Sequence, residues 1–290
     1  MKLIFTIFIL FLSLFTDSQV FAADDEMKYL RPAKEELYLD FNSIIPDTLK
    51  LKGAPQGFAI HGKYALSLRA GGQCIVIDLK NKKFVSSFQL AGIGGHCNSC
   101  EFGIEKYSDD SEFPLLYINE CTGEKSCYVV DISLKGSRTV QRIFYEGKEF
   151  KYAHDWLPQP QKGFIYIYGG KHMGKKYLKK FRMPSLAESD ENGEVRISPD
   201  EVLDTFEIDG LNISQGSQVR KGKAYLPSGP YKNNLIHVIS LNRKKPTAVY
   251  LLGDQNNEPE DMDFRGRWAY VLYHNVKEGR NALIYRMLLR

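Results

Sequence analysis

Imidazole, carboxylate and side-chain amide groups recur at one kind of position in this chain, the first residues of short apolar segments. The positions are Gln56, His96, Asn98, His154, Asp155, Gln215 and Glu260. Neutral imidazoles, amide carbonyls and carboxylates are ligands for divalent cations, and a histidine beside a carboxylate can transfer protons in catalysis. These residue types therefore allow two chemistries, provided that the fold brings them together.

A divalent-metal site would draw on His96, His154 and Gln215, which come from three separate segments. No local spacing such as His-x-x-x-His marks a ready-made metal site. The simplest interpretation of such residues is structural, because polar groups at strand ends normally find hydrogen-bond partners among their neighbours. A metal role therefore depends on convergence in space.

Acid–base catalysis on a sugar or uronate would use Asp155 or Glu260 as the carboxylate and His96 or His154 as the proton carrier. A standard glycoside hydrolase needs two opposed carboxylates. Trp156 and Tyr231 are candidates for stacking on a sugar face. The sequence has no P-loop, nucleophile elbow or dinucleotide fingerprint.

A distant internal repeat indicates the elements that position these residues. Residues 56–68, QGFAIHGKYALSL, are matched by QGSQVRKGKAYLP from Gln215 and more loosely by EDMDFRGRWAYVLY from Glu260. Each copy has polar residues, a short strand, a basic turn and a second strand. Self-similarity of this kind predicts a repeat architecture, and here we expect a β-propeller.

The strand pattern predicts five blades that begin near residues 56, 96, 154, 215 and 260. The fifth blade has only three strands of its own, and residues 36–41 alternate as a strand that can complete it and close the ring. The acidic insertion at residues 185–199 is expected to be a surface loop. A six-bladed propeller is the alternative.

Propeller geometry then predicts one site. The innermost strands begin on one face, and the loops between second and third strands lie on the same face. Those loops carry a second set of polar residues: Arg69, Glu120, Lys171, His172, Tyr231, His274 and Asn275. We therefore expect ligand-binding groups to gather at one mouth of the central channel.

The N-terminus indicates export. Lys2, an apolar run from Leu3 to Phe15 and small residues up to Ala23 are typical of a secretory signal peptide. We expect residues 1–23 to be a signal peptide, residues 24–290 to form the propeller, and no membrane span to remain after cleavage. The mature protein would be periplasmic or extracellular. Its net charge of +4 is spread along the chain, which argues against nucleic-acid binding.

The chain has five cysteines, Cys74, Cys97, Cys100, Cys121 and Cys127. In an oxidising compartment an odd number leaves one thiol free or paired between chains. Cys121 and Cys127 flank a turn, so a disulfide across that hairpin is expected. Cys97 and Cys100 have C-x-x-C spacing, for which a disulfide or structural role is favoured over zinc.

The chain resembles uncharacterised secreted bacterial β-propellers, and a six-bladed, TolB-like propeller is the alternative resemblance. The residues that carry it are Gln56-Gly57, His96-Cys97-Asn98, Phe102-Gly103, His154-Asp155 and Gln215-Gly216. The fold and the export signal together favour an exported protein that binds a glycan or cell-envelope ligand at the channel mouth, although a propeller fold alone does not fix a function. The alternatives are a metal-assisted glycan hydrolase or lyase, with a divalent metal as its cofactor, and a protein-interaction scaffold.

Overall fold

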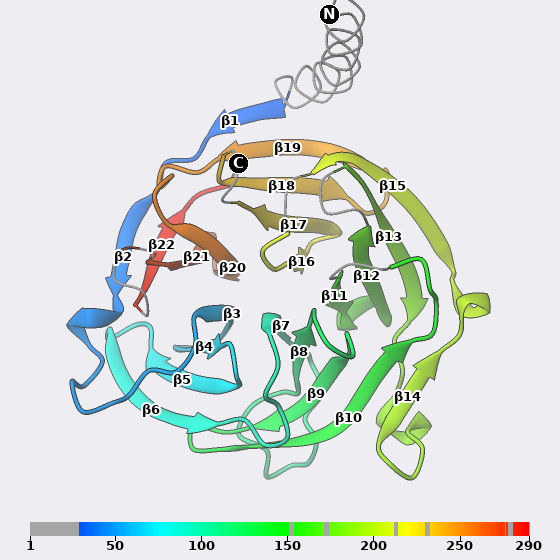
Figure 1. Ribbon diagram of the computed structural model, residues 1–290, viewed down its shortest axis with the longest axis horizontal. Helices are drawn as coiled ribbons and strands as arrows, with labels where there is room; N and C mark the ends of the chain where they lie inside the picture. Colours follow the sequence, from blue (N-terminus) through cyan, green and yellow to red (C-terminus); the bar gives the residue numbers. More distant parts are fainter. Residues whose placement is uncertain are drawn as a thin grey trace, which may run out of the picture.

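A computed structural model describes residues 29–150, 154–170, 174–211, 214–229, 233–275, 277 and 281–289. Five sheets stand around a central axis as the blades of a propeller (Figure 1). The expected fold class, an all-β five-bladed propeller, is therefore confirmed. The predicted signal peptide at residues 1–23 lies outside the described residues. Within the described ranges, no helix has the length and apolar character needed to cross a membrane.

The first three blades follow one another along the chain. Blade 1 contains β3 (Pro55–His61), β4 (Tyr64–Arg69), β5 (Gln73–Asp78) and β6 (Lys83–Gln89). Blade 2 contains β7 (Cys97–Phe102), β8 (Leu116–Glu120), β9 (Cys127–Ile132), β10 (Ser137–Tyr145) and β14 (Glu194–Ile197). Blade 3 contains β11 (His154–Gln159), β12 (Phe164–Gly170), β13 (Gly174–Arg182) and β15 (Asp204–Leu211).

The last two blades each include a strand from the N-terminal segment. Blade 4 contains β16 (Gln218–Arg220), β17 (Lys223–Ser228), β18 (Leu235–Ser240), β19 (Lys245–Leu251) and β1 (Leu30–Pro32). Blade 5 contains β20 (Glu258–Arg265), β21 (Trp268–His274), β22 (Ala282–Met287) and β2 (Glu36–Asp40). The described loops also hold short 3₁₀ helices at Phe41–Ser43, Pro160–Lys162, Leu186–Glu188 and Pro199–Glu201.

The ring closes as the sequence predicts, through the N-terminal strand. β2 pairs antiparallel with β22, with Glu36 opposite Arg286 and Asp40 opposite Leu283. This pairing covers the outer edge of blade 5, which would otherwise expose unpaired backbone groups. It also ties the beginning of the described chain to its end.

Two outer strands were not predicted. β1 pairs parallel with β19, and β14 pairs parallel with β10. β14 comes from the acidic insertion, so the expectation that residues 185–199 form only a surface loop is wrong. Each added strand satisfies backbone groups at an outer sheet edge.

The core lies between neighbouring blades. Each of the five apolar clusters joins residues from two adjacent sheets, as in the packing of Phe58 and Ile75 of blade 1 with Leu272 of blade 5. Burying a large apolar side chain of this kind contributes about 1.5–3 kcal/mol. The blades are thus fixed relative to one another by face-to-face packing.

The repeated Gln-Gly pair has a physical explanation near the axis, where inner strands approach closely. A Cβ atom on Gly57 would lie 3.0 Å from the Cys97 carbonyl oxygen, and one on Gly216 would lie 2.6 Å from the Glu260 carbonyl oxygen. Gly216 also has a φ of +99°, which is unfavourable for other residues. The glycines therefore permit the contact between neighbouring blades.

Candidate functional site at the channel mouth

The inner strands all begin at the same end of the channel, as the register of their hairpins shows. Pro55 pairs with Arg69, Cys97 with Glu120 and Glu258 with His274. Residues at the start of an inner strand thus lie beside residues at the end of the second strand. We refer to this end of the channel as the mouth.

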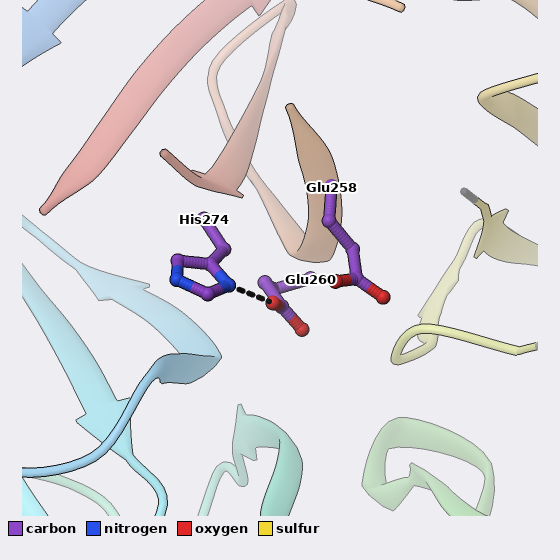
Figure 2. Close-up of side chains that lie close together, drawn as sticks. All are labelled: Glu258, Glu260 and His274. Atoms are coloured by element: carbon purple, nitrogen blue, oxygen red, sulfur yellow. Dashed lines mark ion pairs between the residues drawn. The ribbon is translucent and has the colours of Figure 1, made fainter. Parts of the chain in front are cut away.

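Blade 5 contributes a cluster of two carboxyl groups and an imidazole, shown in Figure 2. Glu258, Glu260 and His274 each offer one ligand atom, and these atoms lie within 4.8 Å of one another. The Nδ1 atom of His274 lies 3.6 Å from the Oε1 atom of Glu260. We call these three residues the mouth cluster.

Glu258 and Glu260 lie two residues apart on β20, and strand alternation places such residues on one side of the sheet. Pro259 pairs with Tyr273 and Asp261 pairs with Leu272, so Glu260 is the extra residue of a β-bulge and has no direct partner on β21. Bulges are common beside functional sites.

The carboxyl groups of the mouth cluster are held in an unfavourable environment. Glu260 is 2% exposed, and its pKa is raised well above the usual value by burial and by the charges of Glu258 and Asp261. Burial also raises the pKa of Glu258, while His274 and Gln215 act in the opposite direction. A positive charge between them would relieve both the repulsion and the desolvation.

Gln215 holds one of these carboxylates. Its Nε2 atom donates a 2.5 Å hydrogen bond to Oε1 of Glu258 and a longer one to the Gly229 carbonyl. Because the amide presents its N–H groups to Glu258, Gln215 is a positioning residue. Its predicted role as a direct metal ligand is therefore not supported by this geometry.

Gln56 lies at the start of β3 and therefore at the mouth. Pro55 pairs with Arg69, and a shift of register separates this pair from Phe58 and Ser67, so Gln56 lies in an irregular part of the strand. The Oε1 atom of Gln56 is buried without a hydrogen-bond partner among the described residues.

Asp155 lies at a second polar centre that joins three blades. Its carboxylate accepts hydrogen bonds from Asn98 at 2.6 Å, Asn119 at 2.5 Å and Ser214 at 2.5 Å. Burial raises its pKa, and the hydrogen bonds from Ser214 and Asn98 oppose that shift. With three donors on a fully buried carboxylate, Asp155 and Asn98 serve as a structural connection, and the predicted catalytic role of Asp155 finds no support.

The two predicted histidine ligands are not members of the mouth cluster. His154 is buried, with its ring 5.4 Å from that of Phe150 and 6.0 Å from that of Trp156. Burial and then the nearby Lys125 charge lower its pKa to about 4. His96 is half-buried, and burial lowers its pKa as well. Both ring nitrogens of His154 are buried without a hydrogen-bond partner among the described residues, and the metal site of His96, His154 and Gln215 stays a prediction.

The two predicted stacking aromatics have different outcomes. Trp156 is 2% exposed and packs in the core between blades 2 and 3, while its indole nitrogen donates to the Lys125 carbonyl. It has no free face for a sugar ring, so that prediction is wrong. Tyr231, like Lys171 and His172, lies outside the described residues.

All five cysteines are buried free thiols, and the expected Cys121–Cys127 disulfide is absent. Cys74, Cys97 and Cys100 pack in the apolar cluster between blades 1 and 2. Burial raises the pKa of each of the five. These thiols have the environment of packing residues, as in the structural role considered for the C-x-x-C pair.

Sequence reasoning missed Glu258 and His274 as partners. Glu258 is part of an acidic run that reads equally well as a solvated loop, and His274 was expected on the correct face but without a partner. The third copy of the repeat could have indicated this pair. Its two strands form a hairpin around a basic turn, and the hairpin places Glu258, just before the copy, opposite His274. The bulge at Glu260 leaves no such signal.

Comparison with known proteins gives a likeness of fold only. No protein-family model matches the chain, and no curated protein matches it. Among solved structures, hydrazine synthase from Kuenenia stuttgartiensis is 12% identical with a TM-score of 0.40, over 78% of this chain and 66% of that one. The Pan2 WD40 domain of Neurospora crassa is 11% identical with a TM-score of 0.36, over 81% of this chain and 64% of that one. The chain thus spans just under two thirds of each.

Proposed function

We propose that this protein is exported and binds an oxygen-rich ligand, a glycan or another cell-envelope component, through a divalent cation held by the mouth cluster. The observation that carries the proposal is the convergence of Glu258, Glu260 and His274 at the mouth. A binding role agrees with the propeller fold, in which ligands commonly occupy a channel mouth.

The donor set favours a cation of intermediate softness. Two carboxylates and one imidazole suit Zn²⁺ or Mn²⁺, whereas Ca²⁺ and Mg²⁺ prefer sites made of oxygen alone. Three protein ligands leave a coordination position for a water molecule or a ligand oxygen. Hydroxyl or carboxylate oxygens of a glycan are suitable occupants of that position.

Two neighbouring amides support recognition of a polar ligand. Gln215 orients Glu258, and support of this type typically raises the metal affinity of a site. The buried oxygen of Gln56 can accept a hydrogen bond from a ligand hydroxyl at the mouth. An unsatisfied buried acceptor costs free energy unless such a partner arrives.

A second candidate function is metal-assisted hydrolysis or elimination on the same class of ligand. The observation that favours it is the Glu260–His274 pair, whose nearest atoms are 3.6 Å apart. A carboxyl group beside an imidazole can accept a proton from a bound water or from a substrate carbon. This hypothesis keeps Glu260 as the candidate carboxylate and takes His274, in place of His96 or His154, as the proton carrier.

Ligand binding is tested with a panel of cell-envelope oligosaccharides and uronates, in metal-free protein, after addition of Zn²⁺ or Mn²⁺, and after chelation. We expect binding that requires the cation and that is lost in His274→Gln but kept in His61→Gln, whose histidine is on the exposed turn of blade 1. Release of reducing or unsaturated ends in the same samples would identify an enzyme. Ligand binding that is equal with and without cation would contradict the proposal.

Export is tested separately. Protein recovered from the periplasm or medium of an expressing bacterium should begin at Ala23 or Asp24, because the predicted cleavage follows Ala22 or Ala23. Retention of Met1 on the purified protein would contradict cleavage of a signal peptide and export.

A further inference from the structure

The opposite end of the channel holds a second pocket, formed where the inner strands finish. It has a volume of about 240 Å³ and is lined by Glu101 and Phe102 of β7, Gln218 and Arg220 of β16, and Asp263 and Phe264 of β20. These residues come at the far ends of strands whose first residues form the mouth. The pocket is therefore distinct from the mouth cluster, and the proposal below does not depend on a ligand at the mouth.

Among the described residues of this pocket, Glu101 is the one whose carboxyl group keeps one buried oxygen without a partner. It is 8% exposed, and its Oε2 atom is buried with no hydrogen-bond partner among the described residues. Burial raises its pKa well above the usual value, the charge of Asp263 raises it further, and a hydrogen bond from the backbone N–H of Val219 acts in the opposite direction. A buried carboxyl oxygen with no donor is costly, so this atom requires a partner that the described chain does not supply.

The carboxylate of Asp263, in contrast, already has three hydrogen-bond donors. It accepts hydrogen bonds from the backbone N–H of Ile60 and of Phe264, both at 2.5 Å, and from Nε2 of Gln218 at 2.6 Å. These bonds join the inner strands of three blades. Asp263 therefore gives the pocket negative charge but has few lone pairs left to bind a metal ion. A metal ion needs several ligand atoms, and the pocket offers it one free carboxylate oxygen, that of Glu101.

The walls and rim suit an organic cation. Phe102 and Phe264 supply aromatic surface on which methylene groups or a cation can pack. The one basic side chain of the lining is Arg220, whose guanidinium stacks on Phe264 at 4.5 Å and donates to the Gly266 carbonyl at 2.5 Å. Arg220 is thus held by Phe264 and Gly266, and against the effect of burial its charge lowers the pKa of Asp263.

We propose that this pocket binds an alkylammonium or alkylguanidinium group, with Glu101 as the anchoring carboxylate. The ligand's N–H groups donate to the free oxygen of Glu101, and its carbon chain lies between the phenylalanine rings. The pocket volume matches a group of side-chain size, such as a free amine or the end of a lysine or arginine residue. Asp261 and Asp263 on β20 add negative charge behind Glu101, and Arg220 opposes it from the rim.

Calorimetry and a thermal-shift titration with butylammonium and butylguanidinium test this assignment, with butanol and butyrate as uncharged and anionic controls. We expect saturable binding of both cations and none of the controls. Glu101→Gln keeps the shape of the side chain and removes its charge, so it should weaken cation binding about tenfold or more. Glu105→Gln, an exposed change in the same blade, should leave the affinity unchanged.

A second variant makes the test independent of Glu101. Arg220→Gln removes the opposing charge at the rim and should tighten cation binding several-fold. N-acetyl-lysine N-methylamide carries the same ammonium group on a peptide backbone, and its affinity relative to butylammonium shows whether the cation comes from a protein side chain or from a free amine. Equal binding of butanol and butylammonium, or an unchanged affinity in both Glu101→Gln and Arg220→Gln, would overturn the proposal.

Discussion

Glu258 and His274 are direct register partners at the open end of the β20–β21 hairpin. This pairing fixes an imidazole beside a carboxylate through the backbone, and Glu260 joins them from two residues further along the same strand. Three potential ligands therefore come from one hairpin and need no movement of one blade relative to another. Such a site is preorganised, which lowers the cost of binding.

The hydrogen bond from Gln215 to Glu258 should strengthen cation binding without direct contact. Gln215→Leu removes the donor that orients Glu258, and loss of a supporting interaction of this kind typically weakens metal affinity about 10–100-fold. Competition titration with a chromophoric chelator measures the change. Gln161→Leu, at an exposed 3₁₀ helix, is the matched control, and equal affinities in the two variants would show that Gln215 has no positioning role.

His237 should make the protein less stable in acid. Burial lowers its pKa to about 4, so between about pH 6.5 and pH 4 the unfolded chain binds a proton at this residue that the folded chain does not. The free energy of unfolding should then fall by about 1.4 kcal/mol per pH unit from this group alone as the pH decreases through that range.

Urea denaturation of the wild type and of His237→Leu across this pH range isolates the contribution, because other buried groups are common to both proteins. The variant should have the shallower dependence of stability on pH. Parallel curves would mean that His237 is protonated in the folded protein.

The glycines of the Gln-Gly repeat should be sensitive to a single added methyl group. Gly216→Ala places a Cβ 2.6 Å from the Glu260 carbonyl oxygen at a positive φ, and we expect it to destabilise the fold by about 1–3 kcal/mol. Gly136→Ala is the control, because no atom lies within 4 Å of its added Cβ. Thermal unfolding that affects the two variants equally would argue against close approach of the inner strands.

The cysteines should react with a thiol reagent only after unfolding. All five are buried and free, and burial raises their pKa values, so little reactive thiolate reaches the reagent in the native state. Titration with Ellman's reagent should find almost no thiol in the native protein and five in denaturant. A count of three thiols in denaturant would indicate one disulfide, and a count of one would indicate two. Either result would make a Cys121–Cys127 disulfide a candidate again.

The blade architecture was predictable because short sequence patterns indicate its strands. The Gln-Gly copies at residues 56 and 215 mark inner strands through a steric requirement for glycine, and residues 36–41 alternate as a strand should. β1 and β14 were missed because strands of three and four residues have too few positions to show a period.

The site was only partly predictable. The shared face follows from the order of strands, which is why Glu260 and Gln215 were expected at the mouth. Which of them meet depends on side-chain direction, and the bulge at Glu260 and the inward packing of Trp156 have no signature in a single sequence. His154 was chosen by residue type, and burial between aromatic rings gives it a structural environment.

Calorimetric titration of the metal-free protein with Zn²⁺ and Mn²⁺ tests the central claim most directly. We expect one cation per chain, bound in the wild type and in His61→Gln, and binding about tenfold or more weaker in Glu258→Gln and in His274→Gln. Far-UV circular dichroism confirms that each variant is folded. No saturable binding in the wild type, or binding that survives in both mouth-cluster variants, would contradict a cation site at Glu258, Glu260 and His274.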